Sequence, residues 1–124
     1  MPKQPVHTDK APAALGPYSQ GIICGNLLFV SGQLGADADG NLPDSVTEQA
    51  EWSLRNISSI VQAAGSSMEK VVKCQVFLTD MGDFSAVNQI YAQFFPTPCP
   101  ARSCIQVCAL PKGAKVEVEA IAEI

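Results

Sequence analysis

Arg102 is the residue of this chain whose type and position most clearly suggest chemistry. It follows Pro100 and stands where a polar loop gives way to the apolar run CIQVCAL. A guanidinium group keeps its charge at any physiological pH, and its planar set of N–H donors matches a carboxylate with paired hydrogen bonds. Arg102 is therefore a candidate for binding a carboxylate, although an arginine at the surface or in a salt bridge would show the same pattern.

Two carboxylates, Glu117 and Glu119, alternate with apolar residues in the final segment KVEVEAIAEI. Residues two apart in a strand point to the same face, so these carboxylates are predicted to share one. The same rule places Arg102 and Cys104 opposite Ile105. If helices cover the apolar sides, Arg102 and both carboxylates lie on the second face of the sheet. Ordinary solvation of an exposed strand face would give the same alternation.

The remaining residue types exclude several kinds of site. His7 is the one histidine, in an N-terminal segment that we expect to be disordered, so no Ser/His/Asp or Cys/His nucleophile and no histidine-rich metal site is expected. The five cysteines form no CxxC pair, and their odd number fits buried, reduced thiols. Any catalysis must then come from arginine, carboxylate, tyrosine, serine or backbone groups.

Composition limits the class of protein. The chain has 124 residues, of which 47% are hydrophobic and 16% charged, which predicts one globular domain over residues 1–124. A formal net charge of -4 repels phosphate backbones and argues against nucleic-acid binding. No signal-peptide pattern and no run approaching the ~18 apolar residues of a membrane span is visible. We therefore expect a soluble, cytoplasmic protein without a membrane partner.

Hydrophobic periodicity predicts an α+β fold. Gly25-Asn26 separates two apolar runs as a hairpin turn does, and Ser45 with Glu48 gives the capping-box pattern of a helix that ends at Gly65. A second helix is predicted from Asp83 to about Phe95. The predicted strands span residues 18–24, 27–33, 71–79, 102–109 and 115–124. Two helices would then cover one face of a largely antiparallel sheet.

Collinear motifs resemble the Rid/YjgF family of reactive intermediate deaminases. The matching segments are APAALGPYSQG (11–21), VSGQLG (30–35), QAAG (62–65), VVKCQVFLTDMGDFSAVNQIYAQFF (71–95), PARSCIQV (100–107) and LPKGAKVEVEAIA (110–122). A single piece such as SGQ is weak, but the ordered set covers nearly the whole chain and is highly specific.

The resemblance implies a fold, an assembly and a reaction. The fold would be chorismate-mutase-like, with two helices on one face of a mixed, largely antiparallel sheet. Three chains would form a homotrimer with a barrel-like centre and active sites between subunits. The reaction would be hydrolysis of 2-imino acids and their enamines, such as 2-iminobutanoate and 2-iminopropanoate, to 2-keto acids and ammonia. These substrates come from pyridoxal-phosphate (PLP) dehydratases, and the resemblance implies no metal or cofactor.

The resemblance also assigns roles by position. Arg102 would grip the substrate carboxylate with help from the backbone N–H of Cys104, and Glu117 would hold the attacking water. The residues implied to line and shape the cleft are Tyr18, Ser31 and Asn88. A direct hairpin between the last two strands would place Glu117 opposite Gln106 or Cys108, displaced from Arg102. A site that needs both residues could therefore draw them from different subunits.

Two other functions stay open at this point. Family members have also been described as translation inhibitors with ribonuclease activity, which the acidic charge and the lack of a basic cluster disfavour here. A ligand sensor or chaperone-like protein would bind a keto acid without turnover. Cys99, where an aromatic residue is common in the family, is the main departure from the pattern and bears on the shape of the loop before Arg102.

Overall fold

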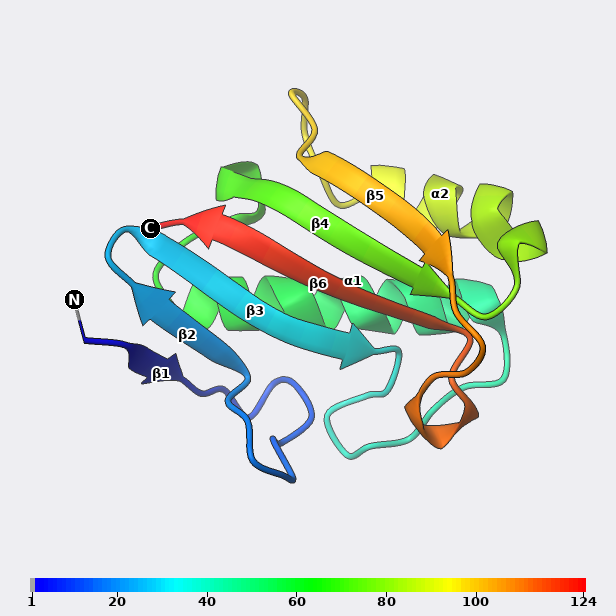
Figure 1. Cartoon of the computed structure of the whole chain (residues 1–124), viewed down its shortest axis with the longest axis horizontal. Coiled ribbons are helices and arrows are strands. Elements are labelled where there is room, and N and C mark those ends of the chain that lie inside the picture. Colours follow the sequence, from blue (N-terminus) through cyan, green and yellow to red (C-terminus); the bar gives the residue numbers. More distant parts are fainter. Residues whose placement is uncertain (1) are drawn as a thin grey trace.

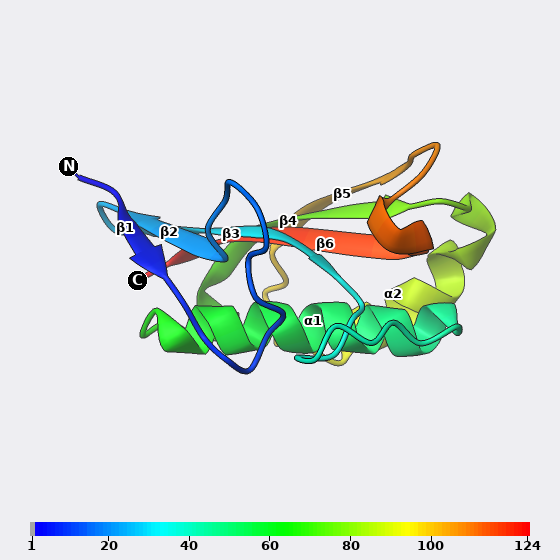
Figure 2. The same ribbon diagram turned by 90° about the horizontal axis from the view of Figure 1, so that it is seen from below.

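Both helices pack against the same face of a six-stranded sheet (Figures 1 and 2). This computed structural model describes residues 2–124. The elements are β1 (Gln4–Val6), β2 (Gly21–Cys24), β3 (Leu27–Leu34), α1 (Val46–Ala63), β4 (Val71–Leu78), α2 (Phe84–Ala92), β5 (Ala101–Gln106) and β6 (Val116–Glu123), with short 3-10 turns η1 (Met68–Lys70), η2 (Met81–Asp83) and η3 (Pro111–Gly113). The predicted α+β class is thus confirmed. None of the helices in residues 2–124 has the length and apolar character to cross a membrane.

The sheet has the strand order β1-β2-β3-β6-β4-β5. Neighbouring strands run antiparallel except β4 and β5, which are parallel because the connection through α2 returns the chain to the same end. β4 lies between β5 and β6, so the last two strands of the chain are not neighbours. The predicted hairpin that set Glu117 opposite Gln106 or Cys108 is therefore wrong, and Glu117 pairs with Phe77 and Leu34 instead.

The core lies between the sheet and α1. Leu54, Ile57 and Ile60 lie on the apolar stripe of α1 and are fully buried. They face strand residues such as Val116 and Val118, which are buried on the helix side of β6. Alternation in β6 leaves Glu117 and Glu119 on the opposite face, as predicted. The helix begins where the capping box predicts, since the Ser45 hydroxyl accepts a hydrogen bond from the backbone N–H of Glu48 at 3.4 Å.

Some element boundaries differ from the prediction. β2 begins at Gly21 and not at residue 18 as predicted, so Tyr18 lies in the loop before the strand. α2 begins at Phe84 after a 3-10 turn, and the side chain that caps this turn is Asp80, through the N–H of Gly82. Asp83 occupies the N-cap position of α2, as predicted, but its side chain makes no capping hydrogen bond.

The N-terminal segment is ordered, contrary to expectation. Residues 4–6 form β1, which pairs antiparallel with β2 at the edge of the sheet. Val6 is buried against the core, and this contact anchors the short strand. The ring of His7 lies 3.0 Å from a carboxylate oxygen of Asp9 at the exposed surface.

The end of β3 passes unusually close to α1. The strand register shifts between Val30 and Gln33, which marks a bulge at the Ser-Gly pair of the SGQ motif. Beyond the bulge, a Cβ on Gly35 would lie 2.1 Å from the backbone oxygen of Gln49. A side chain at position 35 would therefore push the strand away from the helix.

We predict that Gly35→Ala lowers the free energy of unfolding by about 1–3 kcal/mol, the usual cost of overpacking. Urea denaturation followed by circular dichroism measures this change. Gly16→Ala is the matched control, because the atoms nearest to its new methyl group lie at 3.6 Å and the expected change is within about 0.5 kcal/mol. Equal stability of the two variants would contradict the close contact between β3 and α1.

Candidate functional site

Arg102 is held against α2 by three side chains. Its Nη1 donates a hydrogen bond to Oδ1 of Asn88 at 2.6 Å. Its guanidinium carbon lies 4.7 Å from the ring centroid of Tyr91 and 5.6 Å from that of Phe84. Phe84, Asn88 and Tyr91 recur at helical spacing and so present one face of α2 to the arginine. These cation–π contacts and the hydrogen bond fix the guanidinium at the edge of the sheet.

This placement corrects the predicted face of Arg102. Parallel pairing sets Arg102 beside Cys74 and Cys104 beside Val76, and both β4 residues are buried on the helix side. Arg102 therefore lies on the helix side, while Ile105 is 44% exposed on the outer face. The prediction was wrong because it assumed that helices cover every apolar side, whereas the outer face of this sheet is itself partly apolar.

Cys104 lies beside Arg102 on the edge strand. Its half-buried thiol packs against the core, and burial raises its pKa, with the Arg102 charge acting in the opposite direction. The backbone N–H of Val107 donates to Leu78 of β4. Because strand N–H groups alternate in direction, the N–H of Cys104 is expected to point away from β4, toward the open edge. That direction is compatible with the predicted help to Arg102 in binding a carboxylate.

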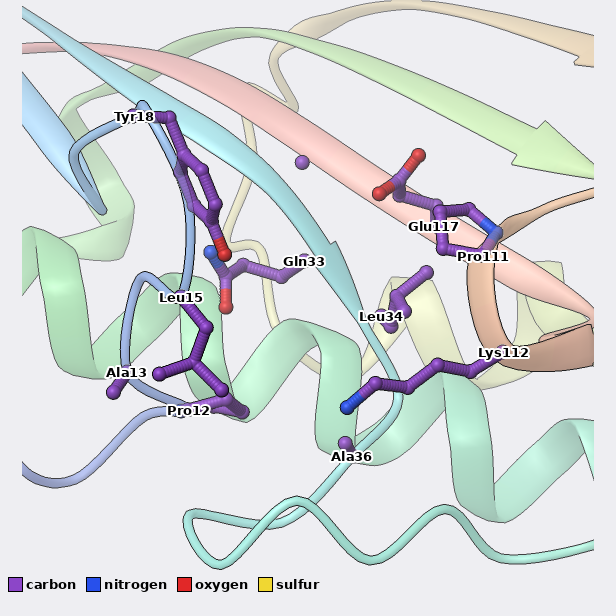
Figure 3. Close-up of a pocket in the computed structure, with 11 residues that line it drawn as sticks. Pro12, Ala13, Leu15, Tyr18, Gln33, Leu34, Ala36, Pro111, Lys112 and Glu117 are labelled. Atoms are coloured by element: carbon purple, nitrogen blue, oxygen red, sulfur yellow. The ribbon is translucent and has the colours of Figure 1, made fainter.

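A cavity of about 380 Å³ opens on the far side of the sheet from α2, beside the end of β3 (Figure 3). Tyr18 and Leu15 reach it from the loop before β2, while Glu117 and Lys112 reach it from β6 and the turn that precedes β6. Its other lining residues are Pro12, Ala13, Gly32, Gln33, Leu34, Ala36 and Pro111. The cavity thus combines apolar walls with a carboxylate, a phenol and an amine.

Glu117 is the carboxylate of this cavity. A Cβ on Gly32 would lie 2.9 Å from the Glu117 carboxyl group, so the glycine leaves room for that side chain. Burial raises the pKa of Glu117, and the nearby Glu119 charge raises it further. A carboxylate held in this way is a stronger base than an ordinary glutamate once it is ionised.

Tyr18 and Ser31 lie on the same side of the molecule as Glu117. The Tyr18 side chain is 54% exposed and lines the cavity. Ser31 sits at the β3 bulge, where its hydroxyl donates to the carbonyl of Ser19 at 2.5 Å and its N–H donates to the carbonyl of Gln20. Ser31 therefore ties the Tyr18 loop to β3, and its oxygen keeps capacity to accept a hydrogen bond.

The predicted residues therefore fall into two groups. Arg102, Asn88 and Cys104 meet at the β5 edge, while Glu117 and Tyr18 meet at the cavity. Within one chain the two groups are separated. Arg102 pairs with Cys74 of β4, whereas Glu117 pairs with Phe77, three residues farther along the same strand. The side chains of Arg102 and Glu117 also lie on opposite faces of the sheet. A site that uses both Arg102 and Glu117 cannot form inside a single subunit.

Sequence reasoning missed several residues of these groups. Phe84 and Tyr91 were not predicted as neighbours of Arg102, although their spacing from Asn88 is visible in the sequence. Lys112 was missed as well. It adopts a left-handed conformation with φ of 61°, which is uncommon for a residue with a side chain and is part of the sharp turn beside the cavity.

The fold and these two half-sites define a small α+β protein with an edge arginine and a carboxylate-lined cavity. Residues 8–124 match the family described as Endoribonuclease L-PSP, and the chain belongs to this family, that of the YjgF and Rid proteins. The resemblance drawn from the motifs is thus confirmed.

Two relatives and two solved structures illustrate the match. A RutC family protein of Sinorhizobium fredii is 54% identical over 95% of both chains. The goat (Capra hircus) 2-iminobutanoate/2-iminopropanoate deaminase is 52% identical over 94% of this chain and 87% of its own. RidA from an Antarctic Psychrobacter superposes with a TM-score of 0.95 at 47% identity, covering 98% of this chain and 99% of that one. Escherichia coli TdcF with bound serine gives 0.93 at 42% identity, covering 98% of each.

We predict that Glu119→Gln lowers the pKa of Glu117 toward its ordinary value without reaching it, because burial is the larger cause of the shift. Carboxyl-carbon NMR during a pH titration measures this directly. The raised pKa means that Glu117 favours folding below its unfolded-state pKa and that this contribution is lost as the pH rises through the folded-state pKa. The loss should be smaller in Glu119→Gln.

The control for this titration is Glu123→Gln, which removes an exposed carboxylate from the same strand. It should leave the Glu117 titration unchanged. An identical Glu117 pKa in wild type and Glu119→Gln would show that the two carboxylates are not coupled.

Proposed function

We propose that this protein hydrolyses 2-imino acids and their enamine tautomers, with 2-iminobutanoate and 2-iminopropanoate as its substrates, to 2-keto acids and ammonia. The observation that supports this most strongly is the fixed guanidinium of Arg102, bonded to Asn88 and stacked on Tyr91 at an open strand edge. Such a group suits a small carboxylate. Relatives about half identical to this chain are named as deaminases of these two imines.

In this proposal Arg102 and Glu117 meet across a subunit interface. The two groups lie apart in one chain, so a neighbouring copy must bring its cavity to the Arg102 edge. The outer face of the sheet supports such an assembly, since Phe29 and Ile105 are 43% and 44% exposed there. Three copies that close around this face would form a homotrimer with a barrel-like centre and three equivalent sites.

The reaction adds one water to the C=N bond. Arg102 and the N–H of Cys104 would hold the substrate carboxylate, which directs the imine carbon toward a water on Glu117. As the water oxygen bonds to that carbon, Glu117 accepts a proton and passes one to the nitrogen. A second proton then moves from the carbinolamine hydroxyl through Glu117 to the amino nitrogen, and the carbon–nitrogen bond breaks as the carbon–oxygen double bond forms, which releases ammonia and leaves the 2-keto acid. Tyr18 and Ser31 line the cleft, and Asn88 shapes it through Arg102.

Positioning and general acid–base catalysis are together large enough to account for catalysis of imine hydrolysis. Positioning of reactants can lower a barrier by up to about 7–11 kcal/mol, and general acid–base catalysis contributes about 10²–10⁴-fold. Imine hydrolysis has a low barrier in water, so these two effects suffice. The raised pKa of Glu117 favours its role as proton acceptor.

The biological setting follows from the substrate. PLP-dependent dehydratases that act on threonine or serine release these imines, so the protein would act beside such enzymes. The free cysteines among residues 2–124 suit a reducing compartment, and we place the activity in the cytoplasm.

RNA cleavage, which the family description names, is the rival function. The net charge of -4 disfavours an RNA-binding surface. Nuclease-free protein tested on RNA beside Arg102→Ala distinguishes the two activities. Cleavage that disappears in the variant would favour the rival, and no cleavage would favour the deaminase.

We predict that Arg102→Ala reduces imine hydrolysis by about 100-fold or more, because a lost ion pair with a desolvated carboxylate costs several kcal/mol. The assay couples threonine dehydratase to loss of imine and enamine absorbance. Arg102→Lys should recover little of the activity, since an ammonium cannot reproduce the planar donor set.

The matched control is Arg55→Ala, which removes the other arginine, stacked on Trp52 at the surface of α1. It should hydrolyse the imine like wild type. Wild-type turnover in Arg102→Ala would refute the assignment of the carboxylate clamp. If wild-type protein binds 2-ketobutanoate but does not accelerate the decay, a sensor function takes the place of the deaminase.

A further inference from the structure

The buried polar side chains of residues 2–124 gather behind the cavity. They are Gln20, Gln33, Gln49, Ser53 and Asn56. Burying a polar group costs free energy unless it is hydrogen-bonded. These side chains are therefore expected to make hydrogen bonds that fix neighbouring backbone segments. Gln20, Ser53 and Asn56 bond to backbone carbonyls of the cavity lining, those of Pro12, Gln33 and Ala36. Gln33 and Gln49 bond to the carbonyls of Ser31 and Pro43.

Among these buried side chains, Gln49 is the one that hydrogen-bonds to the backbone just before Glu117. It belongs to the first turns of α1 and is only 2% exposed. Its side-chain oxygen accepts from the backbone N–H of Lys115 at 2.8 Å, and its amide donates to the carbonyl of Pro43 at 2.7 Å. Lys115 is two residues before Glu117, so Gln49 fixes the start of β6 from behind.

The backbone of Gln49 also sets the opposite wall. The end of β3 packs on it so closely that Gly35 admits no side chain. Leu34, the residue before Gly35, pairs directly with Glu117 across β3 and β6. Two neighbours on α1 hold the same strand end, since Ser53 donates to the carbonyl of Gln33 and Asn56 donates to that of Ala36, both at 2.7 Å.

We propose that Gln49 is a positioning residue for Glu117: it locks the start of β6 and the end of β3 to one point of α1, and so holds the Glu117 carboxylate in place in the cavity. The proposal rests on the function proposed above, because it assigns that function a further residue. Gln49 itself lies behind the cavity wall and acts only through the backbone that it binds.

A positioning role and a purely structural role predict different results. Arg102 lies on β5 and contacts α2, and neither element takes part in the hydrogen bonds of Gln49. Loss of the Gln49 bonds should therefore disturb the step that depends on Glu117 and spare the binding of the substrate carboxylate. A structural role would lower stability without separating these two properties.

The test uses Gln49→Met in the full chain, since methionine has a similar length and makes neither bond. With 2-iminobutanoate supplied by threonine dehydratase, kcat should fall about 10–100-fold while KM and the Kd of 2-ketobutanoate stay within about twofold. In carboxyl-carbon NMR, the pKa of Glu117 should move down toward its ordinary value as the loosened wall admits water. An equal rise in KM and Kd with unchanged kcat would overturn the proposal.

Gln62→Met is the matched control. Gln62 is exposed on the same helix and its side-chain amide donates to the Ser58 hydroxyl, so this variant should keep wild-type kcat and the wild-type Glu117 titration. If Gln49→Met does not fold, Gln49→Glu replaces it, because a carboxyl oxygen can still accept from Lys115. This variant should retain most of kcat, and a loss as large as that of Glu117→Gln would contradict the proposal.

The NMR titration separates this inference from the proposed function. If wild-type protein shows no imine hydrolysis, the proposed function fails, yet the titration still reports whether Gln49 controls the surroundings of Glu117. An unchanged Glu117 titration in folded Gln49→Met would overturn the positioning role whatever the turnover.

Discussion

Alternation of side chains across the sheet is the constraint on which this site depends. A strand presents successive side chains to opposite faces, so pairing in the sheet decides which groups can meet. Parallel pairing with β4 turns Arg102 toward α2, whereas antiparallel pairing turns Glu117 to the outer face. The two groups are therefore separated within the chain, and their cooperation requires a second copy of the molecule.

The side chains of each half-site are already held in position by their neighbours in the protein. Asn88 and Tyr91 hold the arginine, which would reduce the entropy lost in the carboxylate binding that we propose for it. Glycine at position 32 leaves space for the Glu117 side chain, and its burial raises the pKa. Buried polar side chains are costly unless they are hydrogen-bonded, and here Ser53 and Asn56 bond to backbone carbonyls of the cavity wall, while Gln49 bonds to the backbone at the start of β6. Rigidity is thus concentrated where catalysis would need it.

Periodicity and capping signals predicted most of the fold from sequence. The Ser45 capping box, the Gly25-Asn26 turn and the apolar stripe of α1 are local features, and local features determine local structure. The position of β4 between β5 and β6 was not predictable in this way, because strand order depends on contacts between residues far apart in sequence. β1 was missed for the same reason, since its order comes from pairing with β2.

The sequence named candidate site residues but did not predict how they are arranged. Motifs identified Arg102 and Glu117, yet apolarity gave the wrong face for Arg102 because Ile105 lies on an outer face that is also apolar. Lys112 and the buried amide of Gln49 gave no clear signal, since a polar residue in a turn or helix is ordinarily exposed. Their positions beside the cavity and the start of β6 appear only once the tertiary contacts are known.

The most direct test of the central claim mixes Arg102→Ala and Glu117→Gln subunits. Each variant alone should be nearly inactive in imine hydrolysis. If each site takes Arg102 from one subunit and Glu117 from its neighbour, random assembly of an equal mixture, refolded together, restores about one quarter of the sites. Activity near that level would support a site shared between subunits. A mixture no more active than the average of the two variants would contradict it.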